Sequence, residues 1–183
     1  MATPLPEGLT TGTYVIDSSH STASFTVRHA GIAKVRGTIA ITSGTVVVGE
    51  DLESTSVGAE LDAASVNTGD ANRDAHLKSA DFWNAEEKPV WSFSSTSIKP
   101  DGGDYIITGE LTINGVTRTV DLATEFAGTA TDPFGNARAG FESSLEISRK
   151  DFDLTWNAAL ETGGVLVGDK VKIELDVSAI KQA

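Results

Sequence analysis

The chain has no cysteine among its 183 residues. This absence excludes a disulfide scaffold, Cys-ligated zinc, an iron–sulfur cluster and a thiol nucleophile. The phosphate-binding patterns G-x-x-x-x-G-K and G-x-G-x-x-G are missing, as is the G-x-S-x-G turn of many serine hydrolases. No apolar run approaches the roughly 20 residues that span a bilayer, so stable membrane insertion is not expected.

Basic side chains are scarce. There are 14 Lys and Arg against 26 Asp and Glu, which gives a formal net charge of −12. Nucleic acids and anionic membrane surfaces attract basic patches, so the charge argues against both as partners. The N-terminus lacks the basic start and apolar run of a secretory leader, which predicts a cytoplasmic protein; a periplasmic or secreted protein is the alternative if a leader has been removed.

The chain is rich in short apolar runs separated by turn residues. Its 39% hydrophobic content, 18 glycines and length favour one folded domain. Residues 1–12 have no periodicity and are expected to be a flexible lead-in to a single domain at 13–183. Strict alternation over 22–29, 137–148 and 171–179 predicts half-buried strands. Residues 36–41 and 44–49 are interpreted as two strands about a tight turn, and Asn114-Gly115 predicts a two-residue hairpin.

Residues 65–83 interrupt about eight predicted strands. Asp70 and Ser79 are suited to cap two short helical turns, and Arg73-Asp74 is interpreted as a local salt bridge. A short helix must pack its apolar side, here Leu77, Phe82 and Trp83, on the strands. Eight antiparallel strands form a sandwich or a closed barrel, and a lid over an open end favours the barrel. The predicted fold is all-β, an eight-stranded antiparallel lipocalin-like barrel with a short helical lid.

The three histidines are His20, His29 and His76, and three is the ligand number of a catalytic zinc site. Their spacing is poor for that purpose. His29 is in phase with Phe25 and Val27 and is expected to point inward. A buried, hydrogen-bonded histidine and a contact to a ligand head group are the two other interpretations.

Nine of the twelve aromatic residues form a set that includes several predicted inward positions. They are Phe25, Phe82, Trp83, Trp91, Phe93, Phe126, Phe141, Phe152 and Trp156. Aromatic rings fill ordinary cores and also line apolar pockets. From the residues alone, both readings stay open.

Five segments occur in an order that resembles the YceI-like family of lipocalin-like, polyisoprenoid-binding proteins. They are IDSSHSTASFTVRH, SVNTGDANRDAHLKSADFW, GELTINGVTRTV, DPFGNARAGFESSLEISRKDF and VGDKVKIEL, and the resemblance runs from about Tyr14 to Ala179. It implies an extended barrel whose lumen holds an isoprenoid or similar chain, and it implies homodimers.

Two features depart from this family pattern. Many relatives resemble exported proteins with a secretory leader, which this chain lacks, so a periplasmic role need not transfer. Asp153 follows Phe152 where the family usually has glycine. A positive φ without glycine costs about 1 kcal/mol, so a different local turn is expected there.

The predicted function is a non-enzymatic carrier, buffer or store of a long apolar ligand, an isoprenoid quinone or polyprenyl lipid. No other cofactor is expected. The predicted lumen residues are Phe25, Val27, Leu77, Phe82, Trp83, Trp91, Phe93, Phe126, Phe141, Leu145 and Ile173. His29 and Arg73 are the candidates for the polar end. Two alternatives are a metal-dependent enzyme or metal-binding protein using His20, His29 and His76, and a ligand-free, stress-related structural dimer.

Overall fold

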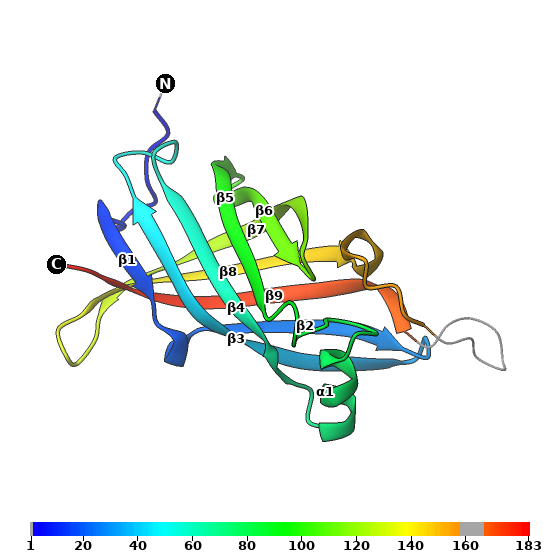
Figure 1. Cartoon of the computed structure of the whole chain (residues 1–183). Coiled ribbons are helices and arrows are strands. Elements are labelled where there is room, and N and C mark those ends of the chain that lie inside the picture. Colours follow the sequence, from blue (N-terminus) through cyan, green and yellow to red (C-terminus); the bar gives the residue numbers. More distant parts are fainter. Residues whose placement is uncertain (1, 158–166) are drawn as a thin grey trace.

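A computed structural model describes residues 2–157 and 167–183 of the chain. Within these residues it contains nine strands, one α-helix and two short 3₁₀ helices (Figure 1). The elements are β1 (Gly12–Ile16), η1 (Ser18–His20), β2 (Thr22–His29), β3 (Ala33–Val48), β4 (Ser56–Asn67), α1 (Ala71–Lys78), β5 (Val90–Asp101), β6 (Asp104–Ile113), β7 (Val116–Thr131), β8 (Ala137–Ser148), η2 (Arg149–Phe152) and β9 (Val167–Lys181).

The strands form one closed antiparallel barrel. Neighbours follow the order β2, β9, β8, β7, β6, β5, β4, β3, and β3 pairs again with β2. Each described strand has a partner on both sides, although β4 and β5 pair over only five residues, Gly58–Asp62 with Val90–Ser94, and beyond Ser94 β5 has ladder pairs only with β6. The predicted all-β, eight-stranded antiparallel barrel with a short helix is therefore confirmed.

The ninth strand shares a barrel position with β2. β1 pairs with β3 at Val15↔Thr45 and with β9 at Val15↔Ile180, whereas β2 pairs with the other halves of the same two strands. η1 lies at the break between β1 and β2. One side of the barrel is thus built from two strand segments that meet at a corner.

The sequence reading of residues 36–49 as two strands about a tight turn is wrong. β3 runs without reversal from Ala33 to Val48, and both of its halves pair with β4. The register shifts between Ile41 and Ser43, which marks a bulge. An extra residue in a bulge bends a strand and produces the same break in alternation as a turn.

The predicted hairpin at Asn114-Gly115 is confirmed. The two residues have φ of 54° and 73°, the positive values that a type I′ turn requires. They join β6 to β7 with Ile113 directly opposite Val116. Local turn chemistry therefore sets the register of these two strands.

Buried side chains form two groups inside the barrel. The first group includes residues of the segment between β4 and β5, and we call it the lid-end core. It consists of Phe25, Ile39, Ala63, Val66, Phe82, Trp83, Ala85, Trp91, Leu111, Ile113, Ile147, Phe152 and Leu154. The far-end core consists of Leu9, Tyr14, Ile16, Ala23, Ile41, Val46, Val48, Ala139 and Ala179. A glycine makes room for a large side chain in each: a Cβ on Gly37 would lie 2.5 Å from the Phe25 ring, and one on Gly44 would meet Ile16.

The N-terminal segment packs on the barrel and makes more contacts with it than a flexible lead-in would make. Leu9 is buried in the far-end core. The amide of Leu52 donates to the carbonyl of Thr3, and the Thr3 hydroxyl donates to Glu53 at 2.6 Å. An apolar residue in a polar stretch is enough to dock it where the barrel offers an apolar site.

Residues 68–89, which we call the lid segment, lie between β4 and β5 (Figure 1). The Asp70 carboxylate accepts from the amides of Asn72 and Arg73, so its predicted N-cap is confirmed. Ser79 does not begin a second helix: it is the C-cap of α1, and its hydroxyl donates to the His76 carbonyl. Turns follow to residue 87. No helix within 2–157 and 167–183 has the length and apolarity that crossing a membrane demands.

Candidate functional site

An apolar cavity of about 220 Å³ runs through the barrel between the two cores. Its lining combines inward side chains of the barrel strands with Leu77 and Phe82 from the lid segment and Leu9 from the N-terminal segment. All eleven predicted lumen residues line it: Phe25, Val27, Leu77, Phe82, Trp83, Trp91, Phe93, Phe126, Phe141, Leu145 and Ile173.

Strand alternation explains why these side chains meet. In β9 the inward Val171 and Ile173 are half-buried, whereas the intervening Lys172 and the following Glu174 are exposed on the outer face. Successive side chains of a strand point to opposite faces, so each strand contributes every second residue to the lumen. Half-burial of an inward residue means that it borders empty space instead of touching a neighbour on all sides.

The lid end of the cavity is closed by aromatic rings. Trp83 packs edge-on against Phe25, with centroids 5.6 Å apart, and against Trp91 at 4.8 Å. A second group joins Phe82, His76 and Trp156 at 4.7 to 5.3 Å. Edge-to-face pairs are favourable because the positive ring edge meets the negative ring face.

Arg73 and Asp74 hold the start of the lid segment, but not as the predicted salt bridge. Both bind Thr68: Arg73 Nε and Nη2 donate to its hydroxyl and carbonyl at 2.8 Å, and Asp74 accepts from its hydroxyl and amide. The Thr68 hydroxyl lowers the pKa of Asp74. Arg73 is absent from the lining, so the structure does not bring it to the lumen as a polar end.

His29 is exposed, and the prediction that it points inward is wrong. β2 and β9 fall out of register between Val27 and His29, the last residue of β2. Beyond such an irregularity, alternation counted from Phe25 no longer assigns a side chain to a face. His29 therefore does not join the lining residues.

A buried arginine that the sequence analysis missed does reach the lumen. Arg149 is 3% exposed and lines the cavity. Its guanidinium donates to four backbone carbonyls, those of Leu154, Trp156, Val167 and Gly168, at 2.6 to 3.3 Å. Burial lowers its pKa. Arg149 continues the inward phase of Leu145 and Ile147, and that alternation was the available signal.

The three histidines are not brought together. His20 lies in η1, His29 ends β2, and His76 in α1 contacts Asp81 at 3.0 Å. In the described part of the chain, no group of three His, Asp or Glu side chains is arranged to hold a metal ion. The geometry thus gives no support to the alternative of a shared histidine metal site.

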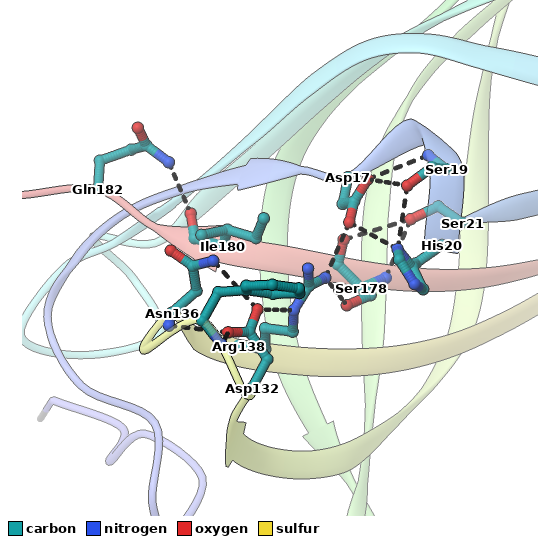
Figure 2. Close-up of polar contacts among 11 residues, drawn as sticks. Asp17, Ser19, His20, Ser21, Asp132, Asn136, Arg138, Ser178, Ile180 and Gln182 are labelled. Carbon is teal, nitrogen blue, oxygen red and sulfur yellow. Dashed lines mark hydrogen bonds and ion pairs between the residues drawn. The ribbon is translucent and has the colours of Figure 1, made fainter.

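Ser19, His20 and Asp17 are in mutual contact at the corner between β1 and β2 (Figure 2). Both the Ser19 hydroxyl and the Asp17 carboxylate contact the same histidine nitrogen, Nδ1, at 3.0 and 2.8 Å. A catalytic triad uses one ring nitrogen for the carboxylate and the other for the serine. This trio is therefore a cap of η1 and not a proton relay.

The same corner carries an ion-pair cluster on the outside of the far-end core (Figure 2). Arg138 bridges Asp132 at 2.8 Å and Asp17 at 2.9 Å, and also donates to the Ser178 hydroxyl. Arg138, together with the Asn136 amide, lowers the pKa of Asp132, and the Ser19 hydroxyl followed by Arg138 lowers that of Asp17. The cluster ties the break between β1 and β2 to β8, β9 and the β7–β8 turn.

Asp153 keeps a left-handed conformation despite not being glycine. Its φ is 58° and its ψ 22°, and its amide donates to the Lys150 carbonyl. Phe152 before it is 1% exposed in the lid-end core. The expected avoidance of a positive φ at this position is therefore not found: Asp153 takes up the left-handed conformation at the end of η2.

Sequence comparison agrees with this architecture. Residues 14–179 match the model of the YceI-like domain. The chain belongs to the YceI-like family. Protein YceI of Escherichia coli O17:K52:H18 is 41% identical over 144 residues, covering 77% of this chain and 75% of that protein. A UPF0312 protein of Pectobacterium atrosepticum is 40% identical over 140 residues, covering 76% and 73%.

Several solved structures share the barrel. A Campylobacter jejuni YceI protein superposes with a TM-score of 0.67 at 28% identity, covering 85% of this chain and 90% of that one. Burkholderia cenocepacia BcnA gives 0.73 at 24% identity, covering 89% and 98%. A polyisoprenoid binding domain from Saccharophagus degradans gives 0.68 at 13% identity, covering 92% and 98%. At these identities the last two establish the fold alone.

Proposed function

We propose that this protein binds a single long apolar chain, an isoprenoid quinone or polyprenyl lipid, and acts as its carrier, buffer or store without catalysing a reaction. The observation that carries the proposal is the lumen: in a chain of net charge −12, apolar side chains line a cavity that joins both cores. Burying a hydrocarbon chain there contributes roughly 0.8 kcal/mol per CH₂. The polyisoprenoid binding domain with the same fold supports this ligand class by analogy.

The present cavity is smaller than the chain it is proposed to hold. Its volume of about 220 Å³ lies below the roughly 300–1,000 Å³ of most small-molecule pockets. Loading must therefore move side chains. We place the movement at the lid end, where Phe82 and Trp83 belong to a segment between strands and can shift without breaking barrel pairing.

The test is mass spectrometry of an organic extract of the purified protein, together with thermal shifts on adding quinone analogues. We expect a co-purified lipid or a rise in melting temperature. Val171→Trp fills the lumen and should abolish both, whereas Lys172→Trp places the same ring on the outer face of the same strand and should leave both unchanged. An extract without lipid, together with no thermal shift, would overturn the proposal and favour a filled, structural barrel.

Homodimerisation and a cytoplasmic location stay predictions. Val15 and Val47 are exposed diagonal neighbours on the outer faces of β1 and β3, and we propose this apolar surface as part of the dimer contact. Light scattering of the wild type and of Val47→Lys tests this proposal, because it measures the mass of each protein in solution. A monomeric wild type would contradict the proposal, and so would a Val47→Lys variant that remains dimeric.

A further inference from the structure

One side chain in the lumen wall has a hydrogen-bond donor without a partner. In the part of the chain that the structure describes, two buried side-chain polar atoms are unpaired, Nε1 of Trp91 and Oδ1 of Asp169. The other oxygen of Asp169 accepts from Ser148 at 2.6 Å, and Asp169 is outside the cavity lining. Trp91 is the one that lines the lumen. A buried indole N–H normally has an acceptor, since leaving it unpaired lowers stability.

The surroundings of Trp91 offer rings and aliphatic groups. Trp91 is 7% exposed in β5, lies opposite Leu61 of β4 and meets the Trp83 ring edge-on at 4.8 Å. Trp83 in turn contacts Phe25. The donor is thus held in apolar packing beneath the lid segment, where a hydrocarbon ligand cannot satisfy it and a ligand oxygen can.

We propose that the Trp91 indole N–H recognises a hydrogen-bond acceptor on the bound chain, a carbonyl oxygen of a planar ring head group, and thereby sets which end of the ligand lies under the lid. This inference rests on the proposed function and adds the orientation and chemical class of the head group. A site with an unpaired buried donor discriminates against ligands that lack the acceptor. The other buried polar side chains of the lining already have partners within the protein: Arg149 donates to backbone carbonyls, and Thr124 is hydrogen-bonded to Ser143.

The closed packing also links this recognition to lid movement. Nε1 has almost no accessible surface, so an acceptor reaches it only after the packing around Trp91, which includes the edge-on contact with Trp83, loosens. The ligand then replaces a ring contact by a hydrogen bond. The competing account is that the N–H is already satisfied by the face of the Trp83 ring. In that case a ligand oxygen would bring no gain.

The experiment compares two probes with the same long alkyl chain, an alkylated benzoquinone and the corresponding alkylbenzene. Binding to wild type, Trp91→Phe and Trp83→Phe is measured by competition against one fluorescent fatty probe. The wild type is expected to prefer the quinone. Trp91→Phe keeps an aromatic ring but removes the donor, so it should lose roughly two- to tenfold of that preference. Trp83→Phe should change the affinity for both probes by the same factor.

The outcomes separate the two proposals. If neither probe binds the wild type, the proposed function fails. If both bind and Trp91→Phe leaves their ratio unchanged, or Trp83→Phe changes it instead, the Trp91 inference fails and the carrier function stands. Should Trp91→Phe not fold, the indole ¹H–¹⁵N resonance of Trp91 in the wild type decides. It should move downfield with the quinone and not with the alkylbenzene, and equal shifts would overturn the inference.

Discussion

The two ends of the barrel are closed by different means. At the lid end, rings of Phe82 and Trp83 from a segment between strands cover the lumen. At the far end, β1 is paired on both sides, and the Asp17, Asp132 and Arg138 cluster fastens it from outside. Ring contacts are individually weak and can re-form in another arrangement, whereas strand ladders and ion pairs hold one geometry. This difference supports the proposal that the barrel opens at the lid end.

The largest expected effect tests this difference directly. Phe82→Ala removes a buried ring from the lid-end core and should lower the free energy of unfolding by about 3–5 kcal/mol. Leu9→Ala removes a buried side chain of the far-end core that lies on the N-terminal segment, and should cost about 2 kcal/mol. Urea unfolding measures both. A larger loss of unfolding free energy for Leu9→Ala than for Phe82→Ala would contradict this prediction.

Two glycines that lie under large side chains, one at each end of the barrel, allow a second comparison of the two ends. Gly37→Ala places a methyl group against the rigid Phe25 ring at the lid end and should cost about 1–3 kcal/mol. Gly44→Ala at the far end meets the terminal methyl of Ile16, which can rotate away, and lies 3.1 Å from the Gly58 carbonyl oxygen; it should cost about 1 kcal/mol. Equal losses in thermal unfolding would contradict the expectation that the Phe25 ring gives way less easily than the Ile16 side chain.

A substitution at Asp153 is expected to stabilise the lid end. Asp153→Gly removes the penalty of a left-handed aspartate and should raise the free energy of unfolding by about 0.5–1 kcal/mol. Asp151→Gly is the matched change two residues earlier in η2. Because η2 is helical there, it should lower stability by about 0.5–1 kcal/mol. The prediction is wrong if chemical denaturation gives both variants the same sign.

The smallest effect near neutral pH is expected at the far-end ion-pair cluster. Hydrogen bonds lower the pKa of Asp132 and Asp17, so the cluster contributes fully above the ordinary carboxyl pKa, about 4, and its contribution is lost as the pH falls toward the lowered values. Arg138→Gln should return these values toward normal. Unfolding free energy should then depend less steeply on pH between pH 4 and 2.

The control for the pH series is Arg118→Gln. Arg118 is exposed on β7 and donates to the carbonyl of its neighbour Thr117. It should retain the wild-type slope because it leaves both carboxylates of the cluster paired. An unchanged slope in Arg138→Gln would show that the cluster is not what makes the far end acid-sensitive.

Part of the candidate site was predictable from the sequence and part was not. Phe25, Trp91 and Ile173 were assigned to the lumen because each lies on an alternating strand, and the structure places all three in the lining. His29 was misplaced because it lies past a register shift. Arg73 was assigned by chemistry alone, and its actual partner, Thr68, lies five residues earlier in the chain.

The sequence by itself determined most of the strands, though not the continuity of β3, together with the Asn114-Gly115 turn and the inward face of each regular strand. These follow from backbone conformation and a period of two, which act over a few residues. The tertiary structure alone decided that β1 and β2 share one barrel position, that Arg149 is buried among carbonyls and that the Trp91 N–H is left unpaired. Each depends on contacts between segments distant in sequence, and barrel closure determines which segments meet.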